Sequence, residues 1–166
     1  MDFLLGNNQR MRFLTDLAAV FDAFEGRERE IDWILGDLEF NFYPPGLRPA
    51  KAPQLFRGAL LSEIVRRGAG RLQFIWGALI AVRPGSETED TCRRLDIAAD
   101  GYTGIWSSSP KFKHATSVCE IVCWDSSETI LLSRDGDVAE RFRRHFPEAI
   151  DLDEYNQRRR RDNPQF

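Results

Sequence analysis

The side chains that could do chemistry in this chain are few, and the most unusual is a glutamate inside an apolar segment. Glu120 interrupts residues 118–124, VCEIVCW, in which all other side chains are apolar or cysteine. A carboxylate there can reach the rim of a sheet, pair with an arginine, or serve a site that perturbs its pKa. One candidate site is therefore a pocket that gathers Glu120 with His114 and Asp125, in a small enzyme or a ligand-binding protein.

A cysteine nucleophile would need a nearby base, and the chain has three cysteines and two histidines. Cys119 and Cys123 lie on one face of the same apolar strand, which is typical of core packing. Their Cα atoms would be about 13 Å apart at about 3.3 Å per residue, whereas a disulfide needs less than about 7 Å. With Cys92 as an odd third cysteine, we expect three reduced thiols in a cytoplasmic protein, and we assign no catalytic residue.

Sequence signatures of common enzymes are missing from the chain. It contains no GxxxxGKS/T, GxGxxG, HExxH, GxSxG or CxxC motif. With only His114 and His145, it cannot form a three-histidine zinc site, and a mixed site would need ligands from separate elements to converge. We therefore predict no metal and no cofactor, and we favour a protein without enzymatic activity.

Aromatic and acidic side chains form a second candidate site, for a protein partner. Tyr102 and Trp106 lie in a segment rich in glycine and serine, where exposed aromatics would anchor a partner and buried ones would only fasten the loop. Asp37 and Glu39 belong to a group of six carboxylates near one predicted strand. The other members are Glu25, Glu28, Glu30 and Asp32. This acidic group either steers a basic partner or is an ordinary solvated surface.

The sequence patterns around these residues predict strands that alternate with helices. Residues 118–133 contain two β-rich segments joined by a turn at 125–127, and Asp125 can instead bond the backbone of this turn. Another β segment covers 72–82, where Gly77 suggests a bulge or the close approach of another backbone. Helical spacing predicts helices near 15–25, 58–67 and 137–146.

Three further segments are less regular. Residues 38–42 alternate between apolar and polar as a half-buried strand does. Residues 47–56 contain prolines and predict a connection over the surface, and residues 86–116 show no clear period. A central hairpin packed by three helices predicts one α+β domain with a mainly antiparallel sheet over residues 1–156.

Length and charge agree with one domain followed by a tail. A chain of 166 residues, 42% of them hydrophobic, can bury one core. The last nine residues, RRRRDNPQF, carry a formal charge of +3, so the rest must carry −6 to give the net charge of −3. We expect residues 157–166 to be a disordered basic tail that either aids solubility or touches nucleic acid. The acidic body argues against nucleic acid.

No apolar run reaches the length of a membrane span. Residues 1–10 contain only three consecutive large apolar residues, too few for the apolar region of a secretion signal. The sequence therefore predicts a soluble, cytoplasmic protein.

Three segments resemble, in this order, parts of small uncharacterised bacterial proteins of the domain-of-unknown-function type. They are FRGALLSEI at 56–64, FIWGALIAV at 74–82 and VCEIVCWDSS at 118–127. The resemblance spans Trp33 to Phe146 and implies no activity. In size, acidic body and absence of catalytic motifs, the chain is also similar to immunity proteins of bacterial toxin systems, which neutralise a toxin by covering it. That similarity implies a cognate partner, such as a basic toxin domain.

From the sequence we therefore predict a protein-binding module. The leading hypothesis is an immunity protein that binds its toxin through the acidic and aromatic residues named above. The alternative hypothesis is the small enzyme or ligand-binding protein with a pocket around Glu120.

Overall fold

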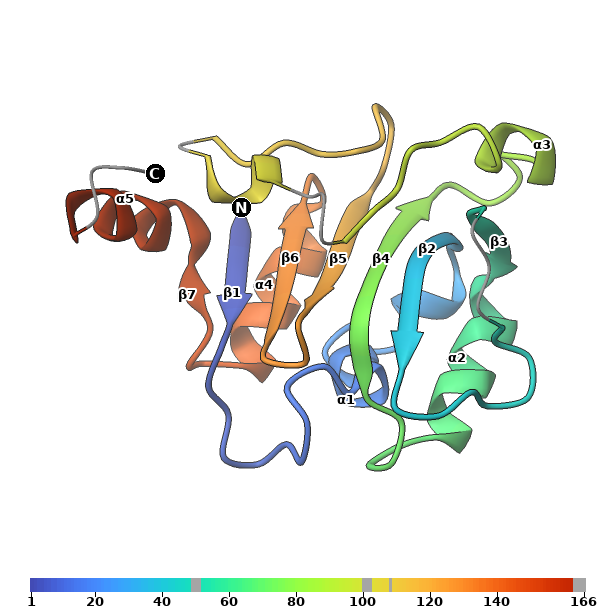
Figure 1. Ribbon diagram of the computed structural model, residues 1–166, viewed down its shortest axis with the longest axis horizontal. Helices are drawn as coiled ribbons and strands as arrows, with labels where there is room; N and C mark the ends of the chain where they lie inside the picture. The colour runs from blue at the N-terminus through green and yellow to red at the C-terminus, as the bar shows by residue number, and fades with distance from the viewer. Residues whose placement is uncertain (49–51, 100–102, 108, 163–166) are drawn as a thin grey trace.

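The fold is a seven-stranded antiparallel sheet covered by helices and loops (Figure 1). The computed structural model describes residues 1–48, 52–99, 103–107 and 109–162. The strands are β1 (Asp2–Leu5), β2 (Asp32–Phe40), β3 (Gln54–Arg57), β4 (Phe74–Val82), β5 (Cys119–Trp124), β6 (Glu128–Ser133) and β7 (Ile150–Asp151). The helices are α1 (Leu17–Asp22), α2 (Gly58–Arg67), α3 (Glu89–Cys92), α4 (Gly136–His145) and α5 (Leu152–Asp162), with 3-10 turns η1 (Arg27–Arg29) and η2 (Thr103–Trp106). The predicted α+β class is confirmed.

Strand β5 is the middle strand of the sheet order β3-β2-β4-β5-β6-β1-β7. It pairs with β4 on one side and β6 on the other, so the predicted segments 72–82 and 118–133 form the centre. Cys119 and Ile121 belong to one core cluster and Val122 to the other. Because both faces of β5 are covered, its side chains must be apolar on both sides.

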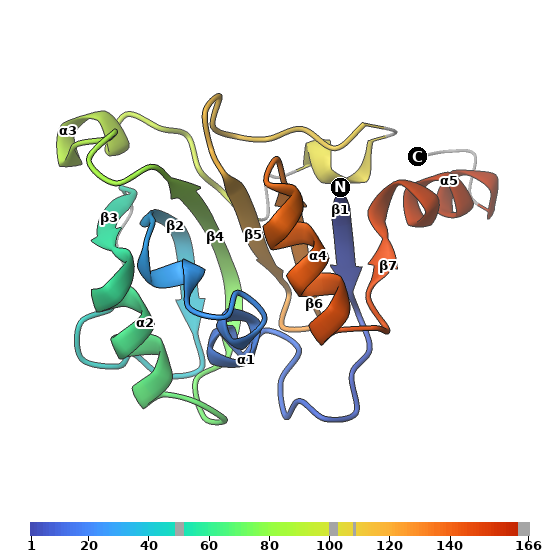
Figure 2. The same ribbon diagram turned by 180° about the vertical axis from the view of Figure 1, so that it is seen from behind.

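Helices α1, α2 and α4 cover one face of the sheet (Figure 2). Helix α2 has the predicted bounds. Helix α4 starts one residue before the predicted range, where the side chain of Asp135 accepts hydrogen bonds from two backbone N–H groups of the first turn. Helix α1 is shorter than the predicted 15–25. Asp16 caps it, and it ends at Asp22 because the chain turns left-handed at Glu25.

On the opposite face, residues 92–99, η2 and the start of α5 pack against the sheet. Figure 1 shows α5 beside β7. Helix α5 corrects the expectation of a disordered tail, since residues 157–162 form its last turns. The reason lies in tertiary contacts: the Asn156 side chain donates to the backbone carbonyls of Ile105 and Ser107, at 2.8 and 3.0 Å. Residues 163–166 lie outside the described part of the chain.

A β-bulge in β2 explains the glycine in β4. Asp37 and Leu38 both lie opposite Gly77, because the pairing shifts register between Gly36 and Glu39. Asp37 takes the left-handed conformation, with φ of 53°. The expectation of a bulge or close approach at Gly77 is thus confirmed, with the extra residue on the partner strand.

The sequence prediction misses three short strands. Strand β3 lies partly in the range 47–56, which predicts only a surface connection, and β1 and β7 have four and two residues. Segments this short carry too few alternating residues to show a period. These strands form because they pair with strands that are distant in the sequence. For example, β1 near the N-terminus pairs with β6, which lies more than 120 residues later.

The turn between β5 and β6 allows a first testable prediction. Asp125 and Ser126 both have positive φ, 44° and 61°, and the Ser127 N–H donates to the Trp124 carbonyl at 3.0 Å. Glycine adopts this conformation without the steric cost that serine bears. We therefore expect Ser126→Gly to raise the free energy of unfolding by about 1 kcal/mol in urea titrations.

The matched control for this substitution is Ser127→Gly. Ser127 is not among the described residues with positive φ, so glycine there gains nothing in the folded state and adds freedom to the unfolded chain. We expect this variant to be no more stable than the parent protein. Equal effects of the two glycines would contradict the strain assigned to Ser126.

None of the helices in the described ranges has both the length and the apolar character that crossing a bilayer requires.

Candidate functional site

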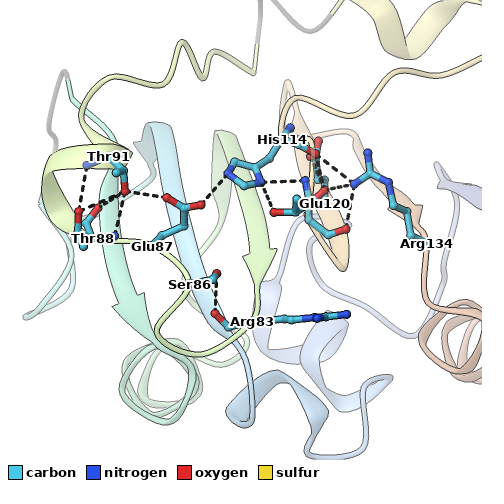
Figure 3. Close-up of polar contacts among 10 residues, drawn as sticks. Arg83, Ser86, Glu87, Thr88, Thr91, His114, Glu120 and Arg134 are labelled. Atoms are coloured by element: carbon cyan, nitrogen blue, oxygen red, sulfur yellow. Dashed lines mark hydrogen bonds and ion pairs between the residues drawn. The ribbon is translucent and has the colours of Figure 1, made fainter.

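Glu120 is completely buried at the start of β5, where it holds the loop that precedes this strand (Figure 3). Its Oε2 accepts a hydrogen bond from the backbone N–H of Lys113 at 2.8 Å. Its Oε1 accepts one from the backbone N–H of His114 and one from the hydroxyl of Ser117, each at 2.8 Å. The carboxylate therefore fixes the path of residues 113–117.

Burial raises the pKa of Glu120 to about 7. The hydrogen bonds from Lys113 and His114, and the charge of Arg134, act in the opposite direction but do not cancel the effect of burial. Raised carboxyl pKa values are frequent in active sites, but structural networks produce them too. The three hydrogen-bond donors named above are backbone groups of the protein and the Ser117 hydroxyl.

The His114 ring contacts a different carboxylate. Its Nε2 lies 3.2 Å from Oε1 of Glu87, whose Oε2 accepts from the Thr91 hydroxyl at 2.7 Å. The Nδ1 atom of His114 accepts a hydrogen bond from the backbone N–H of Thr116 at 3.3 Å. With both ring nitrogens engaged, His114 joins the loop before β5 to the loop after β4 (Figure 3).

Asp125 does not join the other two residues of the predicted pocket. It begins the turn after β5, five residues beyond Glu120, which corresponds to about 16 Å along a strand. Glu120 and His114 do come together, but through the backbone of His114. A pocket that unites Glu120, His114 and Asp125 is therefore not formed, because the first and the last lie at opposite ends of one strand.

The cysteines are part of the core. Cys92, Cys119 and Cys123 are free and buried. Burial raises the pKa of all three thiols, which keeps them in the weakly nucleophilic protonated form. The interpretation of Cys119 and Cys123 as core packing is thus confirmed.

Most of the acidic group is paired within the fold. Glu25 pairs with Arg141 and Arg144 of α4, each at 2.6 Å. Glu28 is buried and pairs with Arg66 of α2 at 3.0 Å. Asp32 pairs with Arg57, and Glu30 lies 3.8 Å from Arg27. Apart from the Glu30 contact within its own turn, these pairs connect elements of the fold, so these carboxylates contribute little unpaired charge toward a partner.

A cluster of aromatic side chains lies on the sheet face opposite α1, α2 and α4, and we call it the tryptophan face. It consists of Trp76 of β4, Trp124 of β5, Trp106 of η2 and Tyr155 of α5, all half-buried. The ring centroids of Trp76 and Trp124 are 5.0 Å apart, and those of Trp106 and Trp124 are 5.3 Å apart. Tyr155 lies 6.0 Å from Trp106. The rings pack edge to face or tilted, as aromatic pairs prefer.

Two of the predicted partner-binding residues belong to this region. Trp106 is a member of the tryptophan face, so it both fastens its loop and keeps part of its surface exposed. Glu39 is exposed and pairs in register with Trp76. Asp37 is half-buried, and its Oδ2 accepts from the Ala99 backbone N–H at 2.6 Å. Tyr102 lies outside the described residues.

No sequence pattern assigns Trp76, Trp124 or Tyr155 to a site. Both tryptophans lie in predicted strand segments, at 72–82 and 118–133, and Tyr155 lies after the last predicted helix at 137–146. Alternation along β4 and β5 is the signal that could have placed the two tryptophans on one face. Nothing in the sequence indicates that η2 and α5 bring Trp106 and Tyr155 beside them.

The geometry therefore defines a single α+β domain with an aromatic sheet face. Within the described ranges, no three His, Cys, Asp or Glu side chains are grouped so that they could hold a metal ion. Comparisons of the chain with models of known protein families, with curated proteins and with solved structures found no match in any of the three. The resemblances inferred from the sequence therefore remain predictions.

Proposed function

We propose that this protein is a non-enzymatic binding module, an immunity protein that neutralises a cognate bacterial toxin domain by covering it. The tryptophan face is its contact surface. The observation that carries the proposal is the packing of three tryptophans and a tyrosine, each half-buried, on one face of the sheet. Tryptophan, tyrosine and arginine are the residues that contribute most to the energy of protein interfaces.

An arginine completes this set. The Arg159 guanidinium lies 5.0 Å from the centroid of the Trp106 ring, and Arg160 donates to the Trp106 backbone carbonyl at 3.3 Å. The rings are therefore held before a partner arrives, which reduces the entropy that binding must overcome. The exposed carboxylate of Glu39 at the rim suits a basic partner.

The engagement of the reactive side chains also favours binding over catalysis. The three thiols are buried, both oxygens of Glu120 accept hydrogen bonds from the preceding loop, and the His114 ring is held by Glu87 and Thr116. These groups stabilise the fold where they stand. The tryptophan face, in contrast, combines ordered rings with accessible surface.

The test is to express the toxin domain encoded beside this gene and to measure both rescue of cell growth and affinity by calorimetry. Trp124 lies at the centre of the tryptophan face, so Trp124→Ala should weaken binding by about 30-fold or more, the effect of a typical hot spot. The matched control is Leu60→Ala, because Leu60 is 51% exposed on α2, on the other side of the sheet. The control should bind and rescue as the parent protein does.

A second variant, Glu39→Lys, keeps the aromatic packing and reverses one exposed charge. For a basic partner it should lower the association rate, with a stronger effect at low salt. Thermal unfolding of each variant shows whether the fold is retained. Complexes that tolerate both Trp124→Ala and Glu39→Lys would exclude the tryptophan face as the interface. The absence of any complex with the neighbouring gene product would overturn the immunity function.

A further inference from the structure

A groove of about 970 Å³ lies at the end of the sheet where β4 and β6 finish and β2 and β5 begin. Four segments that are far apart in the sequence line it. They are residues 27–31, 83–86, 116–118 and 134–136. Three arginines, Arg27, Arg83 and Arg134, come from three of these segments. The groove is separate from the tryptophan face, which lies at other positions of the strands.

Arg134 is held rigidly at the wall of this groove. Its Nη1 donates to the backbone carbonyls of His114 and Ser117, at 3.1 and 2.9 Å, and to the Ser117 hydroxyl at 2.6 Å. Its guanidinium carbon lies 3.7 Å from the centroid of the Phe112 ring. Ser117 is itself buried and donates to Glu120. The buried carboxylate of Glu120 thus fixes the Arg134 guanidinium through Ser117. All three of these hydrogen bonds are donated by Nη1 of Arg134.

Among the three arginines of the groove, Arg83 is the one whose guanidinium has no partner in the described part of the chain. It is exposed, and within the described ranges its guanidinium makes no hydrogen bond or ion pair. Figure 3 shows its side chain extended from the end of β4 toward the side of the sheet that carries Glu120 and Arg134. Two guanidinium groups that line one groove repel each other unless an anion or solvent compensates their charge.

The third arginine is only loosely neutralised. Arg27 lies 3.4 Å from Oδ2 of Asp135 and 3.8 Å from Glu30, longer than good charge-assisted hydrogen bonds. Asp135 caps α4 with its other oxygen. The charged side chains of the lining are therefore three arginines against two carboxylates, Glu30 and Asp135.

The start of α4 adds a favourable backbone surface to the same groove. Gly136 is the first residue of this ten-residue helix, and a Cβ built on it would meet nothing within 4 Å. Its backbone can therefore be approached closely, at the helix end that favours negative charge. Thr116 lines the groove as well.

We propose that this groove binds a small molecule that carries a phosphate or carboxylate group, held between Arg83 and Arg134 at the start of α4. Planar guanidinium groups bind both kinds of anion through paired hydrogen bonds. The site is independent of the proposed immunity function, because none of its residues belongs to the tryptophan face. The volume exceeds that of a lone anion, so the rest of the ligand occupies the space lined by Ile31, Pro84 and Val118.

The experiment is calorimetric titration of the full chain with inorganic phosphate and, separately, with citrate, at constant ionic strength in chloride. We expect saturable one-to-one binding of at least one of them, and which one binds decides between phosphate and carboxylate. Arg83→Ala should weaken this binding at least about tenfold, since it removes a charge-assisted contact. The matched control is Arg94→Ala, which removes an exposed arginine outside the groove and should leave the affinity unchanged.

Arg83→Lys separates charge from geometry, because lysine keeps the charge but loses the paired donors. It should recover only part of the affinity, and thermal unfolding of both Arg83 variants reports on the fold. Three results would overturn the proposal. They are the absence of binding by either anion, binding that Arg83→Ala leaves intact, and equal losses in Arg83→Ala and Arg94→Ala, which indicate unspecific charge screening.

Discussion

Replacing Gly58 by alanine is expected to lower the free energy of unfolding by about 3 kcal/mol or more, a large part of the stability of a domain this size. Gly58 is the first residue of α2, and a Cβ built on it would lie 2.2 Å from the backbone oxygen of Ile31 and 2.3 Å from that of Glu28. Real Cβ atoms do not come this close, so the helix and the turn must separate. The measurement is urea unfolding followed by tryptophan fluorescence.

Gly58 packs against the turn that contains Glu28 and Ile31, and this turn cannot move without breaking hydrogen bonds. The Glu28 carboxylate accepts from Ser62 and Arg66 of α2, each at 3.0 Å, and its backbone carbonyl accepts from the Trp33 indole at 2.9 Å. Displacing the turn would leave these buried groups without partners. The expected cost therefore combines steric overlap with broken hydrogen bonds.

Gly136→Ala is the matched control for Gly58→Ala. Both glycines begin a helix, but a Cβ on Gly136 meets nothing within 4 Å. Alanine there should change the free energy of unfolding by less than about 0.5 kcal/mol. A Gly58→Ala protein within about 1 kcal/mol of the parent would show that α2 can shift away from the turn after all.

Glu120 is expected to make the protein less stable as the pH rises from about 5 to 8. Its folded-state pKa of about 7 lies above the ordinary value of 4.5, so the folded protein retains a proton that the unfolded chain releases. The stabilisation is complete below pH 4.5 and is lost as the pH rises through 7. The difference in pKa corresponds to about 3 kcal/mol.

The measurement compares parent protein and Glu120→Gln in urea titrations at several pH values. Burial also raises the pKa of Asp2 and Glu128, so only the difference between the two proteins isolates Glu120. Glutamine adds a constant cost, because its NH₂ group must face one of the backbone donors, but it does not titrate. The stability of the parent should therefore fall relative to Glu120→Gln as the pH rises.

Glu63→Gln is the control for this comparison, because Glu63 is an exposed carboxylate on α2 that pairs with Arg67 one turn away. Its stability difference from the parent should be small at every pH, as for most exposed helix pairs. A difference between parent and Glu120→Gln that stays constant from pH 5 to 8 would contradict the raised pKa.

The sequence determined the parts of this protein that depend on local patterns. The bounds of α2, the central hairpin and the core positions of Cys119 and Cys123 all follow from side-chain period and turn residues. These signals act within about ten residues, so they can be interpreted along the chain. The α+β class follows from their order.

Only the tertiary structure decided what depends on convergence of distant segments. The edge strands β1 and β7 exist through pairing, and α5 is docked through Asn156 to the backbone of η2. Whether Glu120 served a pocket or the fold depended on the path of the loop before β5, which no local pattern specifies. Likewise, Trp106 lies beside Trp124 only because η2 packs against this face of the sheet. Contacts of this kind depend on chain packing over long sequence separations. Both candidate binding surfaces, the tryptophan face and the groove at the start of α4, are formed by residues that such contacts bring together.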